Sequence, residues 1–139
     1  MDENGNIEVG AREFGREPIS SLLSDEVVFV EADRSVQGAA EVLRGADVGL
    51  AVVRRDGDVV GVVSERDVVG AVARGLDLET TVVDLIETDD LRWSVTTSSI
   101  DAVAEEMLQN HLRHVLVCND DGSLAGVASM RDLLGALLY

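Results

Sequence analysis

Gly61-Val62-Val63-Ser64-Glu65-Arg66-Asp67-Val68-Val69-Gly70-Ala71 is the stretch that decides the fold, because it recurs as Gly126-Val127-Ala128-Ser129-Met130-Arg131-Asp132-Leu133-Leu134-Gly135-Ala136. Residues 52–71 align with 117–136 without a gap at a spacing of 65 residues, and 10 of the 20 positions are identical. Both copies keep a Gly-Val pair and a Ser-x-x-Asp quartet with Arg before the Asp. One structural unit is therefore expected to occur twice.

The composition predicts an aliphatic core and an acidic surface. Apolar residues make up 46% of the chain and aromatic residues only 3%. The 27 acidic residues outnumber the 11 basic ones, all of them Arg, and the net charge is −16. Such a surface repels nucleic acid and anionic lipid. High salt would screen its self-repulsion, so we expect a halophilic protein that binds neither nucleic acid nor membranes directly.

Cysteine usage and hydropathy indicate a cytoplasmic protein. The single Cys118 excludes an intramolecular disulfide and fits a reducing compartment. No apolar run is long enough to cross a bilayer, and no secretory signal is recognisable.

Each copy reads as strand, helix, hairpin and helix, preceded by a short helix. This interpretation rests on serines at the predicted helix starts and on Asp-Gly pairs between aliphatic runs. In the first copy we expect a short helix Pro18–Leu23, strand 27–30, a helix from Ser35 to near Gly45, strands 49–54 and 59–63, and a helix from Ser64 to Gly75.

The second copy repeats this order at an offset of 64 to 65 residues. We expect a short helix 82–86, strand 93–95, helix 99–109 with Ile100, Val103, Ala104, Met107 and Leu108 facing inward, strands 114–118 and 124–128, and a helix from Ser129 onward.

The predicted fold class is α+β, with two tandem β-α-β-β-α units related by pseudo-two-fold symmetry. We divide the chain into an N-terminal extension (1–17), unit 1 (18–76) and unit 2 (77–139). Because the strands are apolar at successive positions, both faces of each sheet are expected to be covered. The small sheets should pack on each other, with the helices outside.

The Ser-x-x-Asp quartet has a structural and a functional interpretation. In the structural one, Ser64 caps a helix and Asp67 bonds back to it in a capping box. In the functional one, the positive end of the helix dipole favours a polar or anionic ligand, and the carboxylate accepts hydrogen bonds from a vicinal diol. Gly61 and Gly126 would let a flat group approach the backbone. These features outline a nucleoside site.

The duplicated units, each ending in Gly-hydrophobic-x-Ser-x-x-Asp, resemble a tandem pair of CBS domains, the module named after cystathionine β-synthase and also called a Bateman module. The resemblance covers residues 18–139. It implies a stand-alone regulatory sensor, without enzymatic activity, that binds AMP, ADP, ATP or S-adenosylmethionine in clefts between the two units. No cofactor is obligatory in such a protein.

The resemblance also implies roles for individual residues. Asp67 and Asp132 would bind ribose hydroxyls, with Ser64 and Ser129 beside them. The adenine pockets would be lined by Leu50, Ala51 and Val62 in one cleft and by Val115, Leu116 and Val127 in the other. The first strands would contribute Val28 and Val30, or Ser94 and Thr96.

The two implied sites differ in their cations. Arg113 and His114 stand where nucleotide-sensing pairs, such as the γ subunit of AMP-activated protein kinase, place basic phosphate ligands, whereas the first copy has Val48 and Gly49. By the family's arrangement they would serve the site of Asp67, which should bind a phosphorylated nucleotide. The Asp132 site should be weaker, empty or selective for a less charged ligand. Arg66 and Arg131 either contact phosphate or are solvated or paired with an acid.

Two departures from the family pattern put affinity in doubt. The Pro that often stands in the second strand is replaced near Ala51 and Leu116, and Glu65 adds negative charge near one prospective phosphate.

Other activities have little support in the sequence. His114 and Cys118 are four residues apart on a predicted strand, about 13 Å, which is too far to chelate one metal. No nucleophile is paired with a base, so no enzyme is expected. The resemblance further implies a homodimer of pairs that acts on a protein partner in trans. The alternative is a ligand-free structural or dimerisation module.

Overall fold

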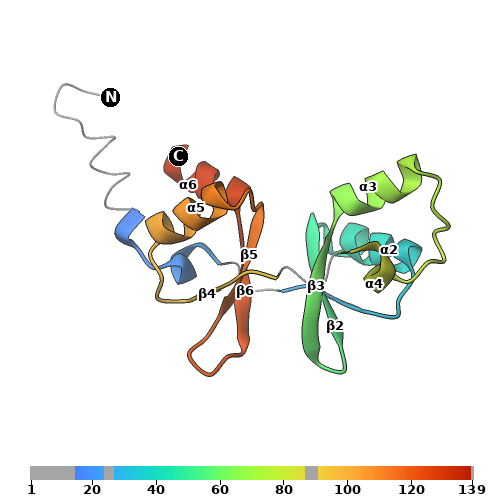
Figure 1. Cartoon of the computed structure of the whole chain (residues 1–139), viewed down its shortest axis with the longest axis horizontal. Coiled ribbons are helices and arrows are strands. Elements are labelled where there is room, and N and C mark those ends of the chain that lie inside the picture. The colour runs from blue at the N-terminus through green and yellow to red at the C-terminus, as the bar shows by residue number, and fades with distance from the viewer. Residues whose placement is uncertain (1–14, 24–26, 87–90, 139) are drawn as a thin grey trace. The chain divides into compact units, whose positions relative to one another are not determined.

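Two three-stranded sheets, each with helices on one side, make up the computed structural model (Figure 1). The structure describes residues 15–23, 27–86 and 91–138. One unit contains β1 (Phe29–Glu31), α2 (Val36–Ala46), β2 (Leu50–Arg55), β3 (Asp58–Ser64), α3 (Glu65–Ala73) and α4 (Val82–Leu85). The other contains the 3₁₀ helix η1 (Ile19–Leu22), β4 (Trp93–Val95), α5 (Ile100–Gln109), β5 (His114–Cys118), β6 (Leu124–Ser129) and α6 (Met130–Leu138). The predicted α+β repeat is confirmed.

The two sheets have the same topology. In each, the first strand runs parallel to the second, and the second pairs with the third in an antiparallel hairpin. The Asp56-Gly57 turn has φ values of 52° and 86°, the left-handed conformation that favours Asp-Gly in tight hairpins. A register shift lies at Val53/Arg54 in one ladder and at Val117/Cys118 in the other. The duplication thus extends to the irregularities of the sheets.

Serine caps begin the helices where the sequence predicted them. The Ser35 hydroxyl accepts from the Gly38 N–H at 3.0 Å, and the Ser99 hydroxyl accepts from the Ala102 N–H at 3.2 Å. The predicted end of α2 near Gly45 is confirmed: α2 ends at Ala46, and Asp47 takes the left-handed conformation at φ 54°. A short polar side chain tolerates that conformation almost as glycine does.

Each unit has its own aliphatic core between its sheet and its helices. The core of the first unit contains Val30, Ala32, Ala39, Leu43, Ala51, Val53, Val63 and Val82. The core of the second contains Ile19, Ile100, Val103, Met107, Val115, Val117, Ala128 and Leu133. The predicted inward position of Leu108 is wrong: its side chain is 67% exposed, because it lies about 100° around α5 from Met107.

Each of the two short helices packs on the sheet of the other sequence repeat. The helix η1 precedes the first repeat but belongs to the unit of β4–β6, and α4 precedes the second repeat but belongs to the unit of β1–β3. The Ile19 N–H donates to the Ser98 carbonyl at 2.7 Å, and Ile19 is fully buried in the core of β4–β6. In the same way, the Val82 N–H donates to the Arg34 carbonyl at 2.7 Å, and Val82 is fully buried in the core of β1–β3.

The compact units are therefore Glu26–Leu91 and the remainder of the chain, and they do not coincide with residues 18–76 and 77–139. The predicted packing of one sheet on the other stays a prediction. Among the helices of the described ranges, none combines the length and hydropathy needed to cross a membrane.

Candidate functional site

The first candidate position is the corner where β3 enters α3. Ser64 ends the strand in an extended conformation and caps the helix, with the Asp67 N–H donating to its hydroxyl at 3.1 Å. The Asp67 Oδ2 atom accepts from the Ser64 N–H at 2.8 Å and from the Ser64 hydroxyl at 3.0 Å. The Glu65 N–H donates to the Gly49 carbonyl at 2.9 Å. A complete capping box is present, and Asp67 is exposed.

The second corner, where β6 enters α6, has the same backbone but a different carboxylate. The Asp132 N–H donates to the Ser129 hydroxyl at 3.0 Å, and the Met130 N–H donates to the Arg113 carbonyl at 2.8 Å. Within the described residues, neither the Ser129 N–H nor the Ser129 hydroxyl donates to the exposed carboxylate of Asp132. Identical Ser-x-x-Asp quartets thus adopt a reciprocal cap in one unit and a one-sided cap in the other.

Arg113 and His114 lie beside this second corner within their own unit. His114 is the ladder partner of Ser129, and the Arg113 carbonyl anchors the first N–H of α6. The predicted match of these two residues to Val48 and Gly49 is wrong by one position, because the strand register places Gly49 and Leu50 at the first corner, with Leu50 paired to Ser64. The structure therefore brings the two basic residues together with Ser129. Their binding to the phosphate of a ligand whose ribose contacts Asp67 stays a prediction.

The predicted adenine-lining residues fall into two groups. The side chains of Ala51 and Val115 belong to the helix-side cores and are each 1% exposed, so a ligand at these positions would meet the backbone. Because side chains alternate across a strand, their neighbours point to the other face of each sheet. Outside both core clusters lie Leu50, Val62 and Val127, which are partly exposed, and Leu116, which is only 2% exposed.

The first strands place their predicted residues in matching registers. Val30 stands opposite Val53, and Ser94 stands opposite Val117, so a buried serine replaces a core valine in the second unit. The Val28 carbonyl accepts from the Val52 N–H at 2.8 Å. The Thr96 carbonyl accepts from the Ser20 N–H at 3.3 Å, which ties Thr96 to η1.

On the side of Gly126 where a Cβ atom would lie, the protein fills the space itself, while the predicted approach of a flat group to the backbone stays a prediction. A Cβ atom built on Gly126 would lie 3.3 Å from three carbon atoms of the Leu23 side chain. The glycine is needed because η1 is followed by Leu23, which packs directly against β6. Long-range contacts of this kind leave no local signal in the sequence.

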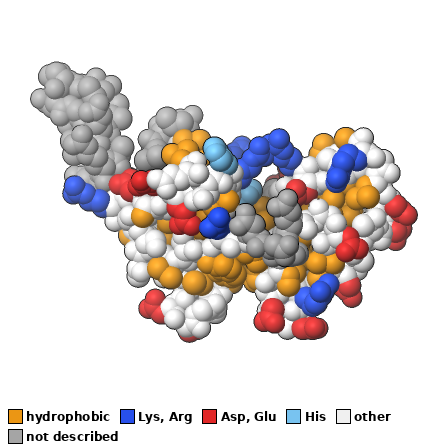
Figure 2. Space-filling model, viewed as in Figure 1, with side chains coloured by type: hydrophobic (Ala, Val, Ile, Leu, Met, Phe, Trp, Pro, Cys, Tyr) orange, Lys and Arg blue, Asp and Glu red, His pale blue; other side chains and the backbone are white. Residues whose placement is uncertain are grey.

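The charged side chains of the described residues are mostly solvated. Arg66 and Arg131 are exposed, and an ion pair joins Arg54 to Glu31 at 2.7 Å. On the face shown in Figure 2, acidic and Arg side chains are interspersed. Among the described residues, no group of three His, Cys, Asp or Glu side chains could hold a metal ion.

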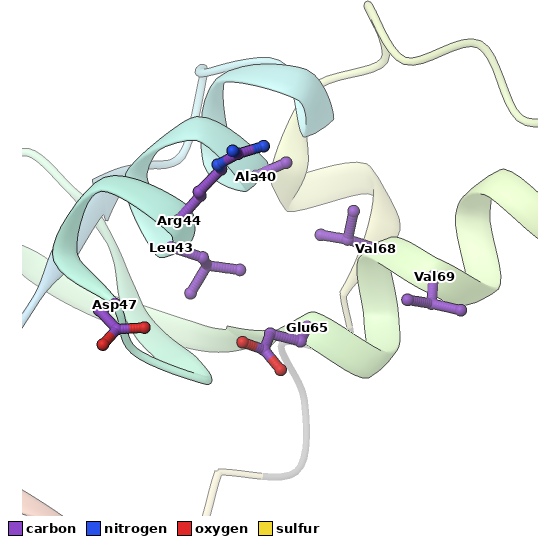
Figure 3. A pocket seen from close by; sticks show the side chains of 7 residues that line it. All are labelled: Ala40, Leu43, Arg44, Asp47, Glu65, Val68 and Val69. Carbon is purple, nitrogen blue, oxygen red and sulfur yellow. The ribbon is translucent and has the colours of Figure 1, made fainter.

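A pocket between α2 and α3 was not predicted (Figure 3). Its charged residues Arg44, Asp47 and Glu65 come from the end of one helix and the start of another, so no sequence spacing links them. The serine cap at position 64 and the left-handed Asp47 are the local signals that place those helix ends.

Comparisons with known proteins identify both repeats. The family model described as "CBS domain" matches residues 19–74 and 94–139. An uncharacterised 17.7 kDa protein of Acidianus ambivalens is 30% identical over 121 residues, which cover 86% of this chain and 73% of that protein.

Two solved structures have the same fold, and at least a quarter of their aligned residues are identical to those of this chain. A CBS domain protein from Pyrobaculum aerophilum, complexed with AMP, is 32% identical with a TM-score of 0.75, and the match covers 87% of this chain and 98% of that one. A CBS-domain-containing protein from Agrobacterium tumefaciens is 34% identical with a TM-score of 0.74, covering 86% and 98%.

Proposed function

The chain belongs to the CBS-domain family, and from this premise we propose that it is a regulatory module that binds an adenine nucleotide. The observation that carries the proposal is the Pyrobaculum aerophilum relative, which has AMP bound and matches 87% of this chain. Both Ser-x-x-Asp corners support it, because each presents an exposed carboxylate at a helix N-terminus. Coupling to a partner requires that the nucleotide binds two conformations with different affinity.

The ribose ligands in this proposal are Asp67 and Asp132, and the phosphate ligands are Arg113 and His114. Ser64, Ser129, Arg66 and Arg131 stand close to these positions in the sequence. Adenine would contact the residues outside the core clusters, namely Leu50, Val62, Leu116 and Val127. AMP, ADP and ATP are the preferred candidates, with S-adenosylmethionine as a less charged alternative for a second, weaker site.

Calorimetric titration of the chain with AMP, ATP, S-adenosylmethionine and adenosine tests the proposal. We expect one tight nucleotide-binding event, weakened about tenfold or more by Arg113→Gln for AMP but not for adenosine, because only phosphate needs the cation. Asp67→Asn and Asp132→Asn, each combined with Arg113→Gln, show which carboxylate shares a ligand with Arg113. Two equal nucleotide sites would contradict the asymmetry.

The ligand-free scaffold is the second candidate, and exposed apolar side chains favour it. Val69 and Val72 on α3 are 66% and 58% exposed, and Leu108 and Leu134 are also exposed. Exposed apolar residues of this kind support a homodimer, which sedimentation would measure. A ligand at 100 times its Kd raises the free energy of unfolding by about 2.7 kcal/mol, so unchanged melting with every adenosine compound would favour the scaffold.

The predicted setting is a halophilic cytoplasm, with a protein partner that receives the signal. The net charge of −16 supports the high-salt part of this proposal. We expect the melting temperature to rise with KCl concentration, since salt screens the self-repulsion. A melting temperature that falls on adding molar KCl would contradict it.

A further inference from the structure

Trp93 lies on the face of the sheet β4–β6 that is turned away from the helices of its unit. The next residue, Ser94, is buried and stands opposite the core residue Val117. Because side chains alternate across a strand, Trp93 points to the other face, where it is 40% exposed. A large aromatic side chain is thus accessible on the face that also carries the predicted adenine contacts of this unit.

Trp93 begins an apolar row that crosses the sheet from edge to edge. It stands opposite Leu116, and Leu116 stands opposite Val127. Leu116 is 2% exposed, so the accessible surface of the row belongs to Trp93 and Val127. The pair of His114 and Ser129 lies on the same face, two residues along the strands, which is about 7 Å away. A nucleoside spans such a distance, with its base on the row and its ribose at the Ser129 corner.

The matching ring in the other unit is Phe29, and one of its faces is covered. The guanidinium of Arg54 lies 4.3 Å from the centroid of the Phe29 ring, and its Nε atom donates to the Glu31 carboxylate at 2.7 Å. By strand register, Val95 and Cys118 replace Glu31 and Arg54 in the unit of β4–β6. The tryptophan therefore has no guanidinium at the position from which the phenylalanine is covered.

We propose that Trp93 stacks on the adenine base of a ligand whose ribose contacts Ser129 and Asp132. This inference rests on the proposed nucleotide function and assigns the recognition at the second, weaker site. Base–aromatic stacking contributes about tenfold or more in affinity and needs no charge on the ligand. The site is therefore selective for the base and not for the phosphate, so adenosine, AMP and S-adenosylmethionine bind there with similar affinity.

Fluorescence titration of the full chain reports on this site alone, because Trp93 is the only tryptophan. Adenosine, AMP and S-adenosylmethionine should each change the emission to saturation, whereas ribose 5-phosphate, which lacks the base, should leave it unchanged. If calorimetry detects adenosine binding but the emission stays constant, the role of Trp93 is refuted and the proposed function stands. Absence of binding by every adenosine compound at millimolar concentration would overturn both.

A matched pair of variants separates the two rings. Trp93→Leu should weaken adenosine binding at this site about tenfold, and Trp93→Phe should retain most of the affinity because an aromatic face remains. Phe29→Leu changes the equivalent ring of the other unit and should leave the affinity unchanged. The methyl NMR signals of Val127, followed against adenosine concentration, measure all three variants at the same site. Equal affinities in Trp93→Leu and Phe29→Leu would refute the assignment.

Transferring the covered arrangement into the unit of β4–β6 gives an independent test. Val95→Glu combined with Cys118→Arg keeps Trp93 but places a guanidinium over its ring, as in the unit of β1–β3. Adenosine should then change the tryptophan emission only at about tenfold higher concentration. An unchanged concentration dependence would contradict stacking on this face.

Discussion

Replacing Asp67 and Asp132 by alanine, one at a time, tests the difference between the two corners. The Asp67→Ala variant loses two hydrogen bonds to Oδ2, at 2.8 and 3.0 Å, and each exposed bond contributes about 0.5–1 kcal/mol. Both aspartates also lie in the first turn of a helix, where the dipole contributes about 0.3–1 kcal/mol. The higher helix propensity of alanine offsets a few tenths of a kcal/mol equally in both.

We therefore expect Asp67→Ala to lower the free energy of unfolding by about 1–2.7 kcal/mol and Asp132→Ala by about 0–0.7 kcal/mol. Urea denaturation followed by circular dichroism measures both, with an unchanged m-value showing that the unfolded state is unaffected. Repeating the measurement in molar KCl weakens the dipole contribution but not the hydrogen bonds, so the difference should persist. Equal losses in the two variants, or a larger one for Asp132→Ala, would refute the one-sided cap.

Three further substitutions test other parts of the structure. His111→Gly should raise the free energy of unfolding by about 0.5–1 kcal/mol, because His111 is exposed at φ 56°, and a lower melting temperature would contradict this. Gly126→Ala should destabilise the chain by about 1–3 kcal/mol through the 3.3 Å contacts with Leu23, and by less in a Leu23→Ala background, which removes the two Cδ atoms but keeps the Leu23 Cβ, as a double-mutant cycle in urea would show. The Ser123 hydroxyl and N–H, at 2.6 and 2.9 Å, hold the pKa of Asp121 below its ordinary value, so its stabilising effect is present above that value and lost as the pH falls through the lowered pKa. Ser123→Ala should raise the pKa of Asp121 in an NMR titration, and an unchanged pKa would count against these bonds.

Local chemistry made much of the fold predictable. Ser35, Ser64 and Ser99 mark helix starts because a serine hydroxyl satisfies an N–H group that the helix leaves unpaired. Asp56-Gly57 marks a hairpin because these residues adopt positive φ. The repeat then transfers each assignment to the other unit.

Tertiary contacts account for what the sequence did not predict. The apolar run around Ala51 could not show which side chains face the helices, because both faces of the strand are hydrophobic. Leu23 reaches Gly126 from a distant part of the chain. The back-bond made by Asp67 and not by Asp132 depends on a side-chain rotamer, which two identical quartets leave undetermined.

The exchange of η1 and α4 determines how the protein can be dissected. A cut between residues 76 and 77 separates the two sequence repeats, but it leaves Val82 on the wrong fragment for the core of β1–β3 and Ile19 on the wrong fragment for that of β4–β6. Each fragment would have a core that lacks one buried side chain, and each would carry the side chain that fills the core of the other fragment. The halves are thus suited to complementation: apart they lack a buried side chain each, and mixed they supply it to one another.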